Sequence, residues 1–502
     1  MAELPLMPFF LGWLATMASG VSTERRRNFV FIMADDFGWS DVDWRDPLLS
    51  TPNLRRLYNS ENTAVLGRSY VNRICSPTRS AFMTGYFPYH QGTQIGYFVP
   101  CEPTGVPQRF QFFPQVLQRG GYSTYMVGKW HLGYCNASML PTRRGFDHFY
   151  GFYLGSEDYY THETSAFRHR GLDFWRQDTA VRDMRGNYSA EIFADKAIQY
   201  IQLHSRRSRR QQKARRGRLG KRKRADKPFF LYLAFQSVHS PMQAPARYLA
   251  NCHQKNQYRR IYCGMVYAMD VAIGRVLNKL KTTDLLKDTV VMFSTDNGGQ
   301  TLNGGNNWPL RGNKGTLWEG GTRSNSFVYS ERDIKRNVVR NNLFHVVDYF
   351  PTILSAAGIN ISSHGDGINQ WEMITTGRQR TIRNEFVYNI DREGSAIRIG
   401  RYKLIVGDAG RPSGWYPVPS LPGGPQGLLG GADSQVDAVL LFDVIADPLE
   451  RINLASTRPL TVKRMVRRLL QLRRSQAPNV HRPPDRRGDP THFNGTFASG
   501  WC

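Results

Sequence analysis

Four short apolar runs, each followed at once by polar side chains, constrain the fold of this chain more than any other feature. The runs cover residues 28–34, 122–127, 229–235 and 289–293. The side chains that follow them include Asp35, Asp36, Lys129, His131, His239, Asp296 and Asn297. Apolar runs of this length are typical of buried strands. In an open α/β sheet the loops at the carboxyl ends of such strands converge on one crevice, so we expect these side chains to meet.

Helical patterns separate the apolar runs. They cover Asn53 to Asn59, Gln115 to Gln118, Ser189 to Leu203 and Gln257 to Lys281. A further helix-like segment spans residues 341–357, interrupted at Pro351 and ended by Gly358. Strands that alternate with helices predict an α/β fold with a large, mostly parallel, doubly wound sheet, which we assign to a catalytic domain over residues 21–380.

The pattern changes after residue 380. Short strands are expected at residues 385–389, 396–399, 402–406 and 439–444, with a Pro/Gly-rich loop at 411–431. An amphipathic helix follows at 460–473, with an apolar face made of Leu460, Met465, Val466, Leu469 and Leu470. The sequence therefore predicts a smaller C-terminal antiparallel sheet plus helix over residues 381–475. Residues 476–502 are predicted to be a polar, extended tail.

The amino-terminal sequence indicates the secretory pathway. Residues 4–19 are apolar and end in small residues, which predicts a signal peptide over residues 1–20 and no stable membrane insertion. Glycosylation sequons fit a secreted or lysosomal protein; they lie at Asn136, Asn187, Asn360 and Asn494. Six cysteines are few for a disulfide scaffold. Cys252 could pair with Cys263 and Cys101 with Cys502, which would leave Cys135 unpaired.

The formal net charge of +27 is unevenly distributed. Residues 206–224 contain twelve Lys or Arg and no acid, which predicts a solvated, disordered insertion. Such a run can bind polyanions, be cleaved by basic-specific proteases, or be a tolerated loop. A nucleic-acid partner conflicts with the signal peptide, and the run lacks interleaved aromatic residues.

The polar residues at the strand ends form two chemical sets. Asp35, Asp36, Asp296 and Asn297 offer hard oxygen ligands, which suit calcium or magnesium better than zinc. Taken singly, such acids are more often turn formers or caps. Lys129, His131, His239 and Lys314 offer positive charge and proton donors for an anionic substrate.

The segment Cys75-Ser-Pro-Thr-Arg79 is neither a zinc nor a thioredoxin pattern, because no second cysteine is nearby. It resembles the Cys-x-Pro-x-Arg signature of the type I, formylglycine-dependent sulfatases. Further stretches are similar to that family and to its arylsulfatase B branch, which acts on N-acetylgalactosamine 4-sulfate. They are Gly121 to His131, Phe229 to His239, Phe293 to Lys314 and Leu441 to Leu454, within a likeness that runs from about residue 28 to 455.

The resemblance implies an alkaline-phosphatase-like fold in which Cys75 is oxidised to formylglycine by the formylglycine-generating enzyme before folding. It implies one calcium ion bound by that side chain together with Asp35, Asp36, Asp296 and Asn297. The hydrated aldehyde would attack sulfur and form a covalent enzyme sulfate. Arg79 would steady the hydrate, and a sulfate pocket would be lined by Lys129, His131, His239 and Lys314. His239 or Lys314 would protonate the leaving oxygen, and His131 would act as the base for collapse.

The chain departs from that branch in three places. Ser76 and Thr78 are exchanged relative to the usual Cys-Thr-Pro-Ser-Arg, and Gly105 and Met139 stand where a local disulfide is usual. The basic insertion is also unlike the branch.

The sequence thus predicts a calcium-dependent sulfatase that hydrolyses sulfate esters of glycosaminoglycans, with N-acetylgalactosamine 4-sulfate of chondroitin or dermatan sulfate as the expected substrate. Two alternatives remain. A phosphatase or phosphodiesterase of the same superfamily would use Ser or Thr and two zinc ions with His ligands. A non-catalytic glycan-binding protein would not need Cys75, Arg79 and Lys129 together.

Overall fold

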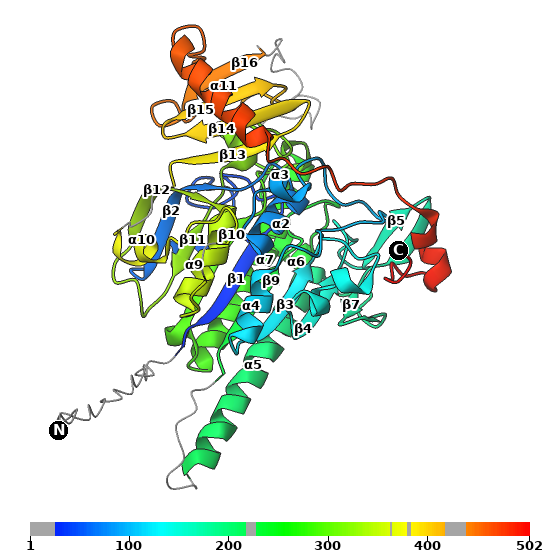
Figure 1. The fold of residues 1–502 in the computed structure, drawn as a ribbon. Coiled ribbons are helices and arrows are strands. Elements are labelled where there is room, and N and C mark those ends of the chain that lie inside the picture. Colours follow the sequence, from blue (N-terminus) through cyan, green and yellow to red (C-terminus); the bar gives the residue numbers. More distant parts are fainter. Residues whose placement is uncertain (1–25, 217–226, 362–363, 379–382, 417–437) are drawn as a thin grey trace, which may run out of the picture.

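The computed structural model describes residues 26–216, 227–361, 364–378, 383–416 and 438–502 (Figure 1). The predicted signal peptide, residues 217–224 of the basic run and most of the Pro/Gly-rich loop lie outside these ranges. Residues 206–216 belong to helix α5 (Ser189–Arg216), so the first part of the basic run is helical rather than disordered. Within the described ranges, none of the helices combines the length and apolar character that crossing a membrane requires.

A sheet of ten strands forms the main layer and confirms the predicted α/β class. Its centre consists of four parallel neighbours in the order β10-β1-β9-β3, which are the four predicted strands; their bounds are Thr289–Thr295, Asn28–Ala34, Phe229–Ala234 and Ser123–Lys129. Ala34 lies opposite Thr295, and Ala234 lies opposite both Met33 and Gly128. The four strands therefore end at one level of the sheet, and the polar residues after them emerge side by side.

Shorter strands extend the sheet on both sides. Parallel β4 (His148–Phe152) follows β3, and antiparallel β7 and β8 (Trp175–Arg176 and Thr179–Ala180) close that edge. On the other side lie β11 (Phe327–Tyr329), β2 (Thr63–Tyr70) and β12 (Val338–His345), of which β11 is antiparallel to its neighbours. A separate hairpin pairs β5 (Glu163–Ala166) with β6 (His169–Leu172).

Helices cover both faces because each central strand is apolar on both sides. In β1, Phe29, Phe31 and Met33 join one core, while Val30, Ile32 and Ala34 join the other. Against the first core pack α2 (Cys75–Thr84), α4 (Phe113–Arg119) and α9 (Tyr349–Ala356). Against the second pack α1 (Pro52–Tyr58), α5 and α7 (Gln257–Thr282). Short helices complete the large layer: α3 (Pro88–Gln91), α6 (Ala246–Leu249), α8 (Glu319–Thr322) and α10 (Trp371–Thr376).

One predicted helix is partly wrong. Residues 338–345 form edge strand β12, parallel to β2, and the helix begins only at Tyr349. Pro351 does not interrupt α9, because it lies in the first turn, where its missing N–H breaks no intrahelical bond. A short apolar run does not by itself indicate whether a segment is a strand or a helix. Here the segment is a strand because it pairs with β2.

The smaller sheet is antiparallel, in the order β13-β14-β15-β16, and α11 (Pro459–Arg473) packs on it (Figure 1, top). The strands are Glu385–Ile390, Gly394–Ile399, Tyr402–Gly407 and Val439–Asp443. Met465 and Leu469 are buried, as predicted. Leu460 and Leu470 were expected on the same face, but they are 82% and 56% exposed. Leu460 and Leu470 are each five residues from Met465, about 140° round an α-helix, so they do not share the buried face of Met465 and Leu469.

A buried polar cluster joins the two sheets, and we call it the junction cluster: Glu319, Lys403, Glu450, Tyr70 and Tyr388. Lys403 Nζ lies 3.2 Å from Glu319 Oε1 and 2.7 Å from Glu450 Oε1. Tyr70 and Tyr388 donate to the two oxygens of Glu319, at 2.8 and 3.0 Å. The Glu319 N–H donates to Glu450 Oε2 at 2.7 Å. Three of the four carboxylate oxygens therefore accept hydrogen bonds, and the fourth, Glu450 Oε1, has no hydrogen-bond partner among the described residues but lies 2.7 Å from the Lys403 ammonium.

Residues 476–502 form what we call the C-terminal strap, which runs from α11 back across the large domain (Figure 1, red). The expectation of a simple extended tail is wrong, because the strap contains 3-10 turns at Arg486–Gly488 and Pro490–Phe493 and buries Phe497 and Trp501. Aromatic side chains placed late in a polar segment supply this anchoring, which the overall composition of the segment does not reveal.

The strap also corrects the predicted disulfides. Cys252 pairs with Cys263 as expected, but Cys502 pairs with Cys135, and Cys101 is not in a disulfide. The N–H groups of Gly500 and Trp501 both donate to the Cys135 carbonyl, which brings Cys502 to that partner. Cys101 instead lies beside the Gly488 carbonyl, at 3.1 Å.

Candidate active site

The carboxyl ends of β1 and β10 supply the acidic floor of the site. Asp35 and Asp36 follow β1, Asp296 and Asn297 follow β10, and all four are buried. The Asp36 N–H donates to Asp296 Oδ1 at 3.3 Å, which joins the two strand ends. Asp36 has a positive φ of 56°, a conformation that short polar residues tolerate best among non-glycine residues. The turn directs Asp35 and Asp36 to different sides of the same centre.

Helix α2 brings Cys75 to this floor. Cys75 is the first residue of the helix, and all ten residues of α2 are buried. Arg79, one turn later, donates through Nε and Nη2 to Asp296 Oδ2 at 3.1 and 2.9 Å, and through Nη1 to the Lys129 carbonyl at 3.0 Å. Arg79 therefore fixes α2 to the ends of β10 and β3, with Cys75 held above the acidic residues.

Two lysines neutralise two of the carboxylates. Lys129 Nζ lies 2.6 Å from Asp35 Oδ2, and Lys314 Nζ lies 2.7 Å from Asp36 Oδ1. Burial opposes the ionisation of Asp35, but Lys129 and His239 outweigh it, so the pKa of Asp35 is lowered. Burial likewise opposes the ionisation of Asp36, and Lys314 and His239 lower its pKa. Both carboxylates are therefore charged and ready to bind a cation.

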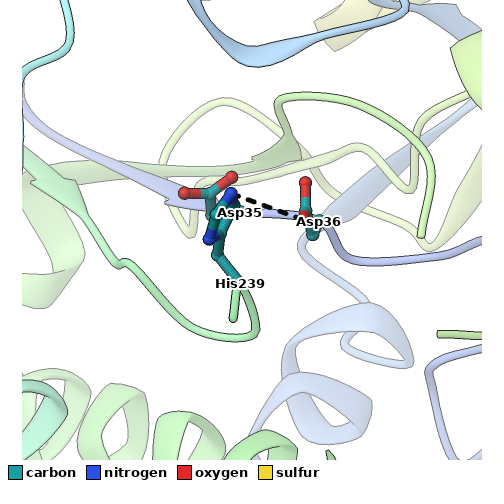
Figure 2. A group of neighbouring side chains, drawn as sticks. All are labelled: Asp35, Asp36 and His239. Carbon is teal, nitrogen blue, oxygen red and sulfur yellow. Dashed lines mark ion pairs between the residues drawn. The ribbon is translucent and has the colours of Figure 1, made fainter. Parts of the chain in front are cut away.

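The two histidines differ in orientation and exposure. His239 follows β9, and its Nε2 lies 3.8 Å from Asp36 Oδ2, the contact drawn as a dashed line in Figure 2. Its Nδ1 lies 2.7 Å from the Ser240 carbonyl. His131 follows β3 and places Nε2 2.8 Å from the Phe98 carbonyl, which assigns the proton to Nε2. Its Nδ1 has no hydrogen-bond partner among the described residues.

Burial lowers the pKa of both rings, with Lys129 adding to the effect at His131 and Lys314 at His239. Both shifts disfavour the imidazolium form in the protein without a bound anion. The free lone pair of His131 Nδ1 suits a base.

The site opens toward Lys314 and His239. Their side chains keep 12% and 17% of their surface exposed, whereas Lys129 and Asp35 are fully buried. A substrate therefore enters on the side of Lys314 and His239, and its charged group reaches the buried side at Lys129.

The donor set fits a hard divalent cation. Ligand atoms of Asp35, Cys75 and Asp296 all lie within 4.8 Å of one another. In the described part of the chain, Asp35 Oδ1 and Asn297 Oδ1 are buried without a hydrogen-bond partner. Buried unpartnered oxygens cost free energy unless another group binds them, and a cation provides that group.

Cys75 is poorly suited to act as a thiol. Burial raises the pKa of the Cys75 thiol, so little thiolate exists near neutral pH. Nucleophilic cysteines require the opposite shift. The shift therefore argues against Cys75 acting as a thiolate nucleophile.

All ten predicted site residues lie in this one cluster, but sequence reasoning missed its supports. The Phe98 carbonyl orients His131, and Ser76 Oγ donates to the His131 carbonyl at 3.1 Å. A Cβ at Gly155 would stand 2.8 Å from the His131 ring, so only glycine fits there. Tyr97, 46% exposed, places its ring 5.9 Å from that of His131. Backbone carbonyls and a loop glycine carry no local sequence signal for this role.

The fold and the cluster define a hydrolase of the sulfatase class. Comparison with known proteins agrees: the family model described as Sulfatase matches residues 27–359, and the chain belongs to the sulfatase family. Sulfatases generally use a formylglycine and a metal ion, and they hydrolyse sulfate esters.

Relatives cover most of the chain. Arylsulfatase J of Mus musculus is 36% identical over 96% of this chain and 81% of its own length. N-acetylgalactosamine-6-sulfatase of Mus musculus is 28% identical over 78% of this chain and 74% of its own length. The crystal structure of Ps i-CgsB in complex with k-i-k-neocarrahexaose has the same fold, with a TM-score of 0.74 at 24% identity, over 91% of this chain and 94% of that one.

Proposed function

We propose that this protein is a calcium-dependent sulfatase that hydrolyses N-acetylgalactosamine 4-sulfate in chondroitin or dermatan sulfate. The observation that carries the proposal is the position of Cys75, held by Arg79 above a buried oxygen cluster that has two unpartnered oxygens. This arrangement supports sulfate ester hydrolysis, and the proposal of the 4-sulfated sugar rests on the sequence motifs that resemble the arylsulfatase B branch.

Asp35, Asp36, Asp296 and Asn297 would hold the calcium ion, together with the side chain at position 75. When bound, the ion draws charge from the sulfate group and holds the nucleophile against it. Oxidised to formylglycine and hydrated, Cys75 supplies the hydroxyl that attacks sulfur.

The charge balance supports a dianionic product. Three carboxylates, Asp35, Asp36 and Asp296, face three cations, Arg79, Lys129 and Lys314. A divalent cation adds two positive charges to this balanced set, and inorganic sulfate offsets them. Lys129 binds the sulfate oxygens from the buried side and Lys314 from the open side.

Proton transfer divides between the open and buried sides of the site. His239 and Lys314 stand on the open side, where the sugar oxygen leaves, so one of them protonates that oxygen. His131 stands on the buried side with Nδ1 free, so it would take the proton of the second hydroxyl as the C–O bond to the bound sulfate breaks, which regenerates the aldehyde and releases sulfate. To identify the proton donor, Lys314→Met and His239→Gln are assayed on sulfate esters with good and with poor leaving groups. An ester with a good leaving group needs no proton donor, so the variant that has lost the donor should keep its activity on that ester and lose activity on the other.

The biological setting follows from the same proposal. The predicted signal peptide and sequons place the enzyme in the secretory pathway, either lysosomal or secreted. The formylglycine-generating enzyme is its partner during synthesis. One relative is named N-acetylgalactosamine-6-sulfatase. Activity on N-acetylgalactosamine 4-sulfate must therefore be compared with activity on the 6-sulfate.

The test uses protein from a secretory host. The tryptic peptide that contains Cys75 should be about 18 mass units lighter than the free-thiol peptide, as conversion of a thiol to an aldehyde requires. Cys75→Ala should abolish hydrolysis. Cys101→Ala is the matched control, because Cys101 is also buried and outside any disulfide, and it should keep activity.

An unmodified thiol in a host that modifies other sulfatases would refute the sulfatase proposal and favour the glycan-binding alternative. Preference for the 6-sulfated sugar over the 4-sulfated one would refute only the substrate.

A further inference from the structure

Helix α11 carries a cationic surface that the active site does not use. Between Pro459 and Arg474 the chain has six basic residues and no acid. Arg468 pairs with Glu385. The other five are exposed, and the structure shows no ion pair for them within the described residues; they are Lys463, Arg464, Arg467, Arg473 and Arg474.

Four of these cations lie on one side of the helix. Lys463, Arg467 and Arg474 are spaced by four and seven residues and therefore share a face, with Arg464 beside them. This face points away from the buried Met465 and Leu469, because those residues pack toward the small sheet. We call Lys463, Arg464, Arg467 and Arg474 the α11 basic stripe.

Helix stability does not account for the stripe. Cations in the last turn are favoured by the helix dipole, which explains Arg473 and Arg474. Lys463 and Arg464 are the fifth and sixth residues of the helix, outside both end turns, so the dipole does not favour them. Like charges four residues apart, such as Lys463 and Arg467, repel each other. An anionic partner would offset this repulsion.

The stripe leads toward the active site. Just after α11, Gln476 Nε2 donates to the Ile390 carbonyl at 3.2 Å. The next residue, Asp391, pairs with Arg73 at 2.8 Å, and the Arg73 carbonyl accepts from the Gly315 N–H at 2.7 Å. Gly315 adjoins Lys314 on the open side of the site. A short chain of contacts therefore connects the end of α11 to the substrate entrance.

We propose that the α11 basic stripe binds a sulfated polysaccharide chain outside the catalytic pocket, so that one polymer occupies the stripe while its sulfated sugar enters the site. The proposal rests on the proposed function for the identity of the polymer. Each exposed cation contributes a small, salt-screened interaction with the anionic chain. Together they raise the local concentration of sulfate groups at the entrance.

The test compares two fourfold variants of the full chain. The first changes Lys463, Arg464, Arg467 and Arg474 to Gln. The control changes the same number of exposed cations elsewhere to Gln: Arg56, Arg119, Lys281 and Arg336. Both variants lose the same net charge, and neither touches the catalytic pocket. Activity is measured on polymeric chondroitin sulfate and on a small aryl sulfate, and binding to chondroitin sulfate is measured directly by titration.

The stripe variant should raise KM for the polymer about 10- to 100-fold, with kcat and the small-ester activity unchanged, as the sum of four surface charge interactions predicts. Its direct binding should weaken by the same factor, and added salt should abolish the difference. An equal loss in the control variant, or no loss in either, would overturn the proposal. Direct binding also separates the stripe proposal from the proposed function. If the wild-type protein binds the polymer through the stripe but hydrolyses neither substrate, only the proposed function is refuted.

A membrane surface is the competing partner, because Leu460 and Leu470 are exposed on the same helix. Leu460→Ala/Leu470→Ala should leave polymer binding unchanged. If that variant instead loses binding to phosphatidylserine vesicles while the stripe variant keeps its affinity for chondroitin sulfate, the stripe is a membrane contact and the proposal fails.

Discussion

The active-site cluster, at the carboxyl ends of the central strands, and the junction cluster, between the two sheets, are both buried groups of charged residues, and they differ in how their oxygens are paired. In the junction cluster, three of the four carboxylate oxygens accept hydrogen bonds, and the fourth, Glu450 Oε1, lies 2.7 Å from the Lys403 ammonium. In the active-site cluster, Asp35 Oδ1 and Asn297 Oδ1 have no hydrogen-bond partner among the residues described.

The difference separates a structural ion-pair network from a binding site. A buried network that satisfies its own groups holds two elements together and has no capacity for a ligand. A network that leaves oxygens unpartnered is less stable alone and gains from binding a cation. Both clusters are buried, and within the described ranges the active-site cluster is distinguished by two oxygens without a hydrogen bond, Asp35 Oδ1 and Asn297 Oδ1. The single such oxygen that the structure describes in the junction cluster, Glu450 Oε1, contacts the Lys403 ammonium.

Replacing one lysine in each cluster tests this distinction most strongly. Lys129→Met should reduce hydrolysis about 10²- to 10³-fold, because it removes a preorganised charge beside the sulfate group. In saturating calcium its free energy of unfolding should fall only slightly, because the cation takes over the compensation of Asp35. Steady-state kinetics and chemical denaturation in the same buffer measure the two effects. A large loss of stability with normal kcat would show that Lys129 is structural.

The matching change, Lys403→Met, should lower the free energy of unfolding by about 3–5 kcal/mol, the usual effect of leaving buried carboxylates without a partner. Its folded fraction should hydrolyse substrate normally. Denaturant titration gives the free energy of unfolding, and activity per folded molecule gives the rate of hydrolysis by the folded fraction. If calcium restored the stability of this variant, the junction cluster would itself be a cation site.

Calcium should stabilise the protein by about 2.7 kcal/mol when its concentration is 100 times Kd. Asn297→Ala should remove most of this gain, because it deletes one of the two unpartnered oxygens. Glu319→Gln, in the junction cluster, should retain it. Thermal unfolding of the wild type and both variants is measured with and without a chelator. If calcium stabilises the two variants equally, the assignment of the cation to the active site is contradicted.

The smallest expected effect is the pH dependence that the junction cluster confers. Burial raises the pKa of Glu450 from 4.5 to about 7, although Lys403 opposes the shift. A carboxyl group whose pKa is higher in the folded state favours folding at low pH, and this contribution is lost as pH rises through 7. Stability should therefore fall by about 2 kcal/mol between pH 5 and pH 7.

Glu450→Gln should flatten that slope, since the amide does not titrate. Denaturant titrations at pH 5, 6 and 7 compare the variant with the wild type. Glu319 acts in a lower range, because Lys403 overcomes its burial and lowers its pKa. If Glu450→Gln keeps the wild-type slope of stability against pH, a group other than Glu450 is responsible for that slope.

The catalytic centre could be predicted from the sequence because its residues follow apolar strands or lie in ordered motifs. Asp35, Lys129 and Asp296 each stand directly at or beyond the end of a buried strand, and parallel register brings them together. Cys75 and Arg79 are one helical turn apart, so the helix places both on the same centre.

The supports of that centre could not be predicted. The carbonyl of Phe98 is a backbone atom, whose role depends on where a loop passes and not on its side chain. The pairing of Cys135 with Cys502 depends on the path of the strap, which composition alone described as a polar tail. Edge strand β12 depends on its pairing with β2, which no local pattern encodes, whereas helical periodicity alone places the exposed Leu460 and Leu470 off the face of Met465.

The Cys135–Cys502 disulfide sets an order of events during synthesis. Its two cysteines are 367 positions apart, so at about 5–20 residues per second a ribosome needs roughly 20–70 s to make the second after the first. Until then the loop that follows His131 has no covalent anchor, and the strap cannot cover the neighbouring loops. Cys75 is buried once α2 has packed, so under the proposed function an enzyme that oxidises it would act before that packing. This modification could therefore precede closure of the disulfide and docking of the strap.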